Sequence, residues 1–220
     1  MTIRGVLFDF SGTLFRLEMG ESWLPGHAGA ARAQELMQVM TAPTGPATLL
    51  PVHLTEEWHR RDLDPEVHRR VYTESLRQAG LTDPGVAELG YDGMLDPASW
   101  AVYPDVRAAL ERLRDKGIPV AVVSNIAWDI RPIFEGVGLA DLVTEYVLSF
   151  QEGAVKPDEK LFRIACDRLG VEPADALMIG DSAEADGGAA ALGCAVEIIP
   201  ALPTTGRPDA LLAALARHGL

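Results

Sequence analysis

The chain has few cysteines, no long apolar run and too few basic residues to balance its acidic ones. Only Cys166 and Cys194 occur in 220 residues, and both fall in apolar segments, which predicts buried free thiols. No stretch reaches the roughly 20 apolar residues that a membrane span needs. The first residues have too short an apolar run for a signal peptide. These features predict a cytoplasmic protein without a membrane partner.

The formal net charge of -13 bears on the class of ligand. A strongly acidic surface repels phosphate backbones and acidic lipids, so we expect no nucleic-acid partner. A small phosphorylated metabolite remains compatible, because it needs only a local cluster of donors and a metal ion. The length and the 48% hydrophobic content allow one full core with room for a smaller accessory domain.

Short apolar runs alternate with helical patterns in the second half of the chain, which is typical of an α/β fold with a parallel sheet. Helices are predicted before Gly117 and before Gly170, each with an apolar period and a glycine stop. The candidate strands are residues 5–10, 119–124, 146–150, 176–180 and 195–199.

Residues 15–97 differ, because they show helical patterns but no convincing buried strand. We expect helices over 27–40, 55–61, 65–79 and 83–89, and a loop over 41–51 that is rich in Pro, Thr and Gly. The pattern predicts an inserted helical cap subdomain over 15–97, with a core domain formed by 1–14 and 98–220.

Polar residues follow four of the candidate strands. Asp9 ends the first strand, Ser124 and Asn125 end the second, Lys156 follows the third, and Asp181 follows the fourth. Open α/β sheets bind ligands at the carboxyl ends of their strands, so these side chains should meet at one edge.

Phosphoryl transfer suits this set of side chains. A divalent cation held by Asp9 and Asp181 would neutralise phosphate charge and let a carboxylate approach phosphorus. Lys156 and Ser124 would hold phosphate oxygens, the Asn125 amide could donate to an anionic oxygen, and Asp186 could fix Lys156 by an ion pair.

In order and spacing, Asp9 to Thr13, Ser124, Lys156 and Gly180-Asp181 with Asp186 resemble the four motifs of the haloacid dehalogenase (HAD) superfamily. The resemblance implies a doubly wound, Rossmann-like sheet in which the five candidate strands, numbered along the chain, take the order 5-4-1-2-3. It also implies a type-1 helical cap. Asp9 would form an aspartyl intermediate, Ser124 and Lys156 would hold the transferred group, and Mg²⁺ would bind Asp9, Asp181 and the main-chain carbonyl of Ser11.

Ser11 departs from the family's phosphatases, which carry an aspartate there as general acid and base. A serine hydroxyl has no pKa near neutrality, so catalysis could fall by about 100 to 10,000-fold if nothing replaces the aspartate. The sequence therefore leaves open a phosphatase with altered acid/base help or a ligand-binding relative that turns over slowly. Dehalogenases of the family lack that aspartate too, but they use no metal and do not keep the Gly180-Asp181 pair.

Phosphonoacetaldehyde hydrolases need a cap lysine, and residues 15–97 contain none. The same segment holds His27, His53, His59 and His68. One of them could stand in for the missing acid, with His27 the preferred candidate. Solvated helix faces are the stronger expectation, as for His59 and His68. Trp23, Trp58 and Trp100 are expected to pack in the interior.

Overall fold

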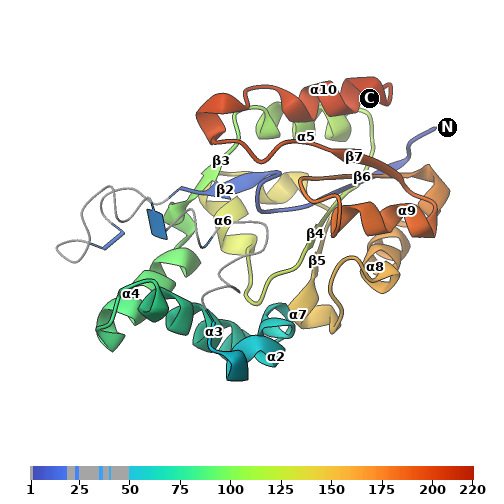
Figure 1. Cartoon of the computed structure of the whole chain (residues 1–220). Coiled ribbons are helices and arrows are strands. Elements are labelled where there is room, and N and C mark those ends of the chain that lie inside the picture. The colour runs from blue at the N-terminus through green and yellow to red at the C-terminus, as the bar shows by residue number, and fades with distance from the viewer. Residues whose placement is uncertain (1, 19–22, 25–34, 37–39, 41–49) are drawn as a thin grey trace. The chain divides into compact units, whose positions relative to one another are not determined.

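The computed structural model describes residues 2–18, 23, 24, 35, 36, 40 and 50–220 (Figure 1). The chain divides into two compact units. The core unit comprises Met1–Arg16 and Ala101–Leu220, and the helical unit comprises Leu17–Trp100. Among the described residues, no helix has the length and apolarity to cross a membrane.

A five-stranded parallel sheet forms the centre of the core unit, in the order β5-β4-β1-β6-β7. This confirms the α/β fold and the strand order that the family resemblance implied. In β1, Val6 pairs with Val120 of β4 and Leu177 of β6. The strands are β1 (Gly5–Phe8), β4 (Val120–Ser124), β5 (Glu145–Leu148), β6 (Ala176–Gly180) and β7 (Ala195–Ile198).

Three strands end earlier than the sequence predicted, and the difference in β7 is a single residue. β1 stops at Phe8, because the next turn folds so that the Phe10 carbonyl accepts the N–H groups of Leu14 and Phe15, each at 3.0 Å. β5 stops at Leu148, where the short helix α7 (Ser149–Glu152) begins. The Ser149 hydroxyl accepts the Ile126 N–H at 2.8 Å and donates to the Ile126 carbonyl at 3.0 Å, which binds the chain to the end of β4 instead.

Helices pack against the sheet (Figure 1). Leu161, Phe162 and Ala165 of α8 join Leu7 and Val123 of the sheet in one buried cluster. The same cluster contains the two cysteines, which are buried free thiols as predicted. Besides α7, the core-unit helices are α5 (Val106–Asp115), α6 (Arg131–Gly136), α8 (Glu159–Leu169), α9 (Ala189–Leu192) and α10 (Ala210–Arg217), with 3-10 turns η5 (Ala140–Leu142), η6 (Pro173–Asp175), η7 (Asp186–Gly188) and η8 (Thr204–Gly206).

The helical unit contains α2 (Thr55–Trp58), α3 (Pro65–Gln78) and α4 (Pro84–Leu95), with 3-10 turns η2 (Val52–Leu54), η3 (Arg61–Leu63) and η4 (Pro97–Ser99). Asp64 begins α3 by accepting two backbone N–H groups, and Asp83 begins α4 by accepting that of Gly85. α2 is shorter and α4 longer than predicted. Most of the helix expected over 27–40 and of the loop expected over 41–51 lies outside the described residues.

A separate two-stranded sheet is formed by β2 (Phe15–Leu17) and β3 (Trp100–Val102). The sequence analysis did not predict it. Three residues are too few for an alternating pattern to stand out.

Candidate active site

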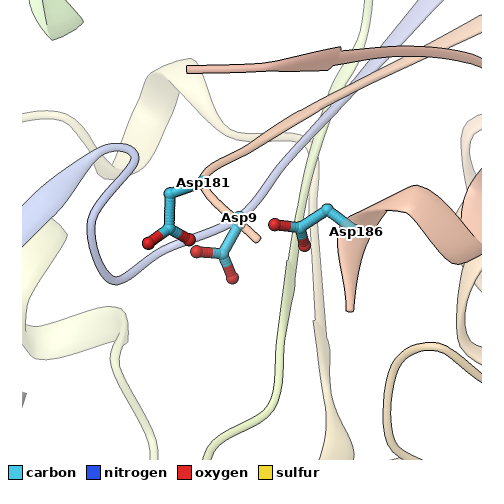
Figure 2. Close-up of side chains that lie close together, drawn as sticks. All are labelled: Asp9, Asp181 and Asp186. Carbon is cyan, nitrogen blue, oxygen red and sulfur yellow. The ribbon is translucent and has the colours of Figure 1, made fainter. Parts of the chain in front are cut away.

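Three aspartates meet at the carboxyl edge of the central sheet (Figure 2). Asp9 follows β1, Asp181 follows β6, and Asp186 begins η7. One carboxylate oxygen from each lies within 4.8 Å of the others. The neighbouring positions of β1 and β6 explain this meeting, since both strands end at the same edge.

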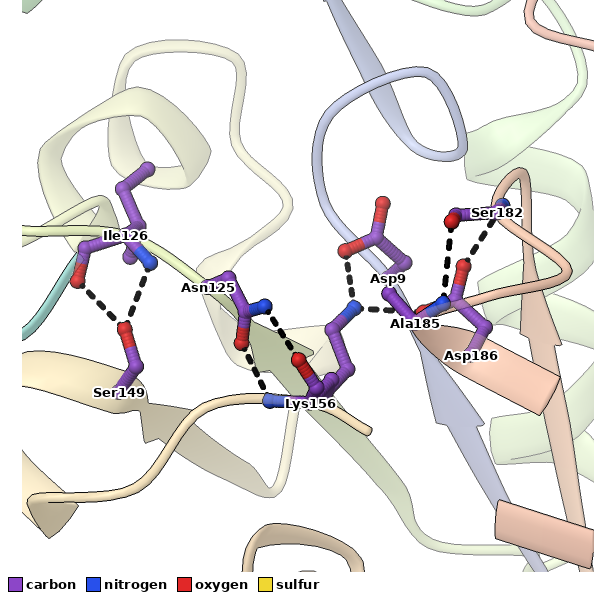
Figure 3. Close-up of polar contacts among 8 residues, drawn as sticks. All are labelled: Asp9, Asn125, Ile126, Ser149, Lys156, Ser182, Ala185 and Asp186. Carbon is purple, nitrogen blue, oxygen red and sulfur yellow. Dashed lines mark hydrogen bonds and ion pairs between the residues drawn. The ribbon is translucent and has the colours of Figure 1, made fainter. Parts of the chain in front are cut away.

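Lys156 connects two of these aspartates (Figure 3). Its Nζ donates to Asp9 Oδ1 and to Asp186 Oδ1, each at 2.6 Å. The ion pair with Asp186 was predicted from the sequence and is confirmed. The second oxygen of Asp186 accepts the Ser182 N–H at 2.9 Å, so both carboxylate oxygens of Asp186 have partners.

Burial and charge shift the protonation equilibria of this cluster. Burial raises the pKa of Asp9 to about 7, Lys156 opposes the rise, and Asp186 and Asp181 add to it. The pKa of Asp181 is also raised, by burial and then by the charge of Asp186. Burial disfavours the Lys156 ammonium, but the Asp9 and Asp186 carboxylates outweigh it and raise the pKa of Lys156. Lys156 is therefore protonated at neutral pH, but its single positive charge does not balance the negative charge of the three carboxylates.

Two glycines make room for the carboxylates. A Cβ at Gly180 would lie 2.0 Å from Asp186 Oδ2, and one at Gly12 would lie 2.5 Å from Asp181 Oδ2. Gly12 also has a φ of +83°, a conformation that favours glycine. The turn after β1 can approach Asp181 only because position 12 has no side chain.

The structure gives Asn125 a different environment from the one expected. The sequence analysis placed its amide on the phosphate, but the Asn125 side chain is bonded to the backbone of Lys156. Its Oδ1 accepts the Lys156 N–H at 2.7 Å, and its Nδ2 donates to the Lys156 carbonyl at 3.0 Å (Figure 3). Ser124 is buried at the end of β4, and Ser11 is exposed in the turn after β1.

The expectation for His68 was wrong. Its ring is buried, lies stacked on Tyr72, and has Nδ1 at 2.8 Å from the Tyr91 hydroxyl. Burial, with the charge of Arg61, lowers the pKa of His68 to about 3, so the ring is neutral. His27 lies outside the described residues.

The three tryptophans expected in the interior are buried. Trp23 and Trp100 donate their indole N–H groups to the carbonyls of Gly90 and Met94, and Trp58 packs on Val67 and Val71.

The cluster fits a divalent cation. Three carboxylates and one ammonium carry a formal net charge of -2 in a largely buried site. Carboxylate oxygens are the ligands that Mg²⁺ prefers. Both oxygens of Asp186 already have partners, Lys156 and the Ser182 N–H. Asp9, which contacts Lys156 through Oδ1, and Asp181 are therefore the better available ligands.

Two residues that support this site were not predicted. Ser182 holds Asp186 through its backbone N–H, and Arg207 donates to the carbonyls of Gly12 and Thr13. Ser182 acts through its backbone N–H, which almost every residue type has, so the sequence gives no signal for it. Arg207 lies about 195 positions from its partners, so no local pattern could connect them.

The fold and the site define a Rossmann-like α/β protein with a carboxylate–lysine centre at the carboxyl edge of its sheet. The model of the haloacid dehalogenase-like hydrolase family matches residues 3–193. The chain therefore belongs to this family.

Curated relatives match over part of their length. A phosphoserine phosphatase from Thermus thermophilus is 33% identical over 118 residues, which is 53% of this chain and 47% of that protein. Haloacid dehalogenase-like hydrolase domain-containing protein 3 from Bos taurus is 36% identical over 117 residues, 51% of this chain and 47% of that protein. The matches thus span about half the length of these relatives.

Solved structures of both phosphatases and dehalogenases are similar to the chain. A HAD phosphatase from Thermococcus onnurineus has a TM-score of 0.56 at 28% identity, covering 90% of this chain and 86% of that one. A dehalogenase has a TM-score of 0.69 at 25% identity, covering 90% of this chain and 84% of that one. Similarity of the overall fold does not distinguish a phosphatase from a dehalogenase. The residues of the site must therefore make that distinction.

Proposed function

We propose that this protein is a magnesium-dependent phosphatase that acts on a small organic phosphate with Asp9 as the nucleophile. The observation that carries the proposal is the placement of Asp9, which contacts the buried Lys156 ammonium at 2.6 Å and lies beside the carboxylate of Asp181. A site with this charge pattern can hold a metal ion and a phosphate together. The phosphatase names of several relatives agree with it.

Asp9, Asp181 and the main-chain carbonyl of Ser11 would hold the ion. Bound there, Mg²⁺ supplies positive charge that offsets the negative charge of the carboxylates and the phosphate. Asp186 and Asn125 position Lys156, the first through its ammonium and the second through its backbone. Lys156 and Ser124 bind the oxygens of the transferred phosphoryl group.

The reaction has two steps. A carboxylate oxygen of Asp9 attacks phosphorus, a bond forms between them, and the ester oxygen leaves with its electron pair and takes up a proton from solvent water. Water then attacks the phosphorus of the aspartyl phosphate and loses a proton to solvent, the bond between phosphorus and the Asp9 oxygen breaks, and inorganic phosphate leaves with the Asp9 carboxylate restored. Lys156 stays protonated throughout and stabilises charge on the phosphoryl oxygens.

Ser11 makes both proton transfers slow. It can neither protonate the leaving oxygen nor deprotonate the attacking water near neutral pH, and each role is worth about 100 to 10,000-fold in rate. A substrate whose leaving group is already a stable anion, such as p-nitrophenyl phosphate, avoids the first deficit but not the second. We therefore expect a burst of p-nitrophenol, followed by slow turnover.

The helical unit would act as a cap that excludes water from the reaction. The two free thiols suit the reducing cytoplasm as the place of action. The acidic charge argues for a small-molecule substrate and against a nucleic-acid partner.

Phosphate release from a panel of metabolites tests the proposal. We expect release that requires Mg²⁺, stops with a chelator and is abolished in Asp9→Asn. Ser11→Asp should raise turnover, because it restores a carboxylic acid at that position. A wild-type protein that releases no phosphate from the panel while Ser11→Asp does so would indicate a binding protein derived from a phosphatase.

Dehalogenation is the competing activity. A haloacid carries its own carboxylate, which the Asp181 carboxylate would repel when no metal ion is bound. Halide release that is indifferent to chelators, without phosphate release, would overturn the phosphatase proposal.

A further inference from the structure

Arg207 is a buried cation next to the turn that follows Asp9. Its side chain comes from the segment before α10, and the residue is 2% exposed. Nη1 donates to the Gly12 carbonyl at 2.7 Å, and Nη2 donates to the Thr13 carbonyl. One planar guanidinium thus binds two successive carbonyls of the turn between Asp9 and β2.

The guanidinium is itself held in place. It lies over the ring of Tyr103, with 3.2 Å between the guanidinium carbon and the ring centroid. The Tyr103 hydroxyl donates to the Leu202 carbonyl at 2.7 Å, and Asp105 accepts the N–H of Leu211 at 2.7 Å. These contacts fasten the C-terminal segment to residues 103–105, so Arg207 approaches the turn from a fixed support.

The turn that Arg207 binds is the one that follows Asp9 and packs against the carboxylate of Asp181. Gly12 lies against Asp181, and Asp9 and Ser11 flank the same turn. Because the carbonyls of Gly12 and Thr13 accept hydrogen bonds from Arg207, they do not point toward the aspartate cluster.

We propose that Arg207 is a positioning residue for the cation site: it fixes the turn so that Asp9 and the Ser11 carbonyl are presented beside Asp181. This inference rests on the proposed function. It goes beyond the family assignment, because the match ends at residue 193 and Arg207 lies past it.

Two substitutions and one matched control test it. Arg207→Met removes the paired N–H donors of the guanidinium together with its charge. Arg207→Lys keeps the charge but cannot bind two carbonyls in the same planar geometry. Arg107 is the control, because its Nη2 also donates to two successive backbone carbonyls, Val137 at 2.7 Å and Gly138 at 3.2 Å, but at the exposed end of a helix. Mg²⁺ affinity is measured by isothermal titration calorimetry, beside kcat and KM for p-nitrophenyl phosphate.

Residues that orient metal ligands typically change metal affinity by about 10 to 100-fold when they are lost. We expect a loss of that size in Arg207→Met, a smaller loss in Arg207→Lys, and wild-type affinity in Arg107→Met. The kcat deficit of the Arg207 variants should shrink as Mg²⁺ is raised, with KM for the ester unchanged at saturating Mg²⁺. A merely structural role would lower thermal stability without this dependence on Mg²⁺.

Wild-type Mg²⁺ affinity in folded Arg207→Met overturns the inference, and the same result in Arg207→Lys overturns it if the methionine variant does not fold. The proposed function fails separately. A wild-type protein that binds Mg²⁺ but releases no phosphate would end the phosphatase proposal, while weaker Mg²⁺ binding by the Arg207 variants would still support the positioning role.

Discussion

Replacing Lys156 by methionine should destabilise the core unit strongly. The lysine side chain is 2% exposed and makes two ion pairs at 2.6 Å, with Asp9 and Asp186, whose side chains are 9% and 1% exposed. Removing one partner of a buried ion pair costs about 3–5 kcal/mol, because the remaining charge is left without compensation. For a chain of this size, each kcal/mol shifts the midpoint by roughly 2–4 °C, so we expect a fall in Tm of about 6–20 °C.

The loss should depend on pH and on Mg²⁺. Without the ammonium, the pKa of Asp9 rises further above its ordinary value, because the lysine opposed that rise. An aspartate whose pKa is raised in the folded state is most favourable at low pH and loses its contribution as pH rises through that pKa. The deficit of Lys156→Met should therefore be largest above the wild-type pKa of about 7 and smaller in acid. Mg²⁺ should recover part of it.

Chemical and thermal unfolding followed by circular dichroism measure this loss, in a chelator and then with Mg²⁺. Lys160→Met is the matched control, since Lys160 Nζ makes one exposed contact, with the Glu152 carbonyl at 3.1 Å. Surface substitutions of this kind usually change stability by less than about 0.5 kcal/mol. If Lys156→Met loses no more stability than Lys160→Met, the account of a buried charge bridge is wrong.

Three further predictions concern the surroundings of the site and the helical unit. Asn125→Ala removes both hydrogen bonds to the Lys156 backbone and should cost about 1–3 kcal/mol in stability, measured by urea unfolding, together with a lower kcat. Gly180→Ala places a Cβ 2.0 Å from Asp186 Oδ2, so Mg²⁺-dependent turnover should fall, with a normal rate arguing against this packing. The native state binds fewer protons than the unfolded chain between the pKa of about 3 for buried His68 and its ordinary value of 6.5, so stability should fall as pH falls through this window; unfolding midpoints against pH should show the fall and its flattening in His68→Phe.

Much of the core unit followed from residue patterns. The central strands β1, β4 and β6 are short, apolar and buried along their whole length, so the sequence identified them, and the carboxyl ends of β1 and β6 placed Asp9 and Asp181 at one edge. The order of the strands, by contrast, was predicted from the family resemblance, because apolar periodicity does not show which strands are neighbours.

Asn125 and His68 have partners that the sequence analysis did not foresee, and the physical cause is the same for both. The contacts of Asn125 are with backbone atoms 31 positions away, and those of His68 depend on Tyr91, 23 positions along the chain. A polar side chain looks solvated in sequence when its partners come from another element. Local pattern therefore found the charges of the site and the Lys156–Asp186 pair, but not the contacts of Asn125, Ser182 and Arg207 that support them.

Trapping of the covalent intermediate tests the central claim most directly. Wild-type protein is mixed with Mg²⁺ and p-nitrophenyl phosphate, quenched and treated with borohydride, which reduces an aspartyl phosphate to homoserine. Because Ser11 cannot activate water, the intermediate should accumulate, and peptide mass spectrometry should find homoserine at position 9, less of it in Ser11→Asp and none in Asp9→Asn. Steady phosphate release with Asp9 unmodified under these conditions would contradict the account.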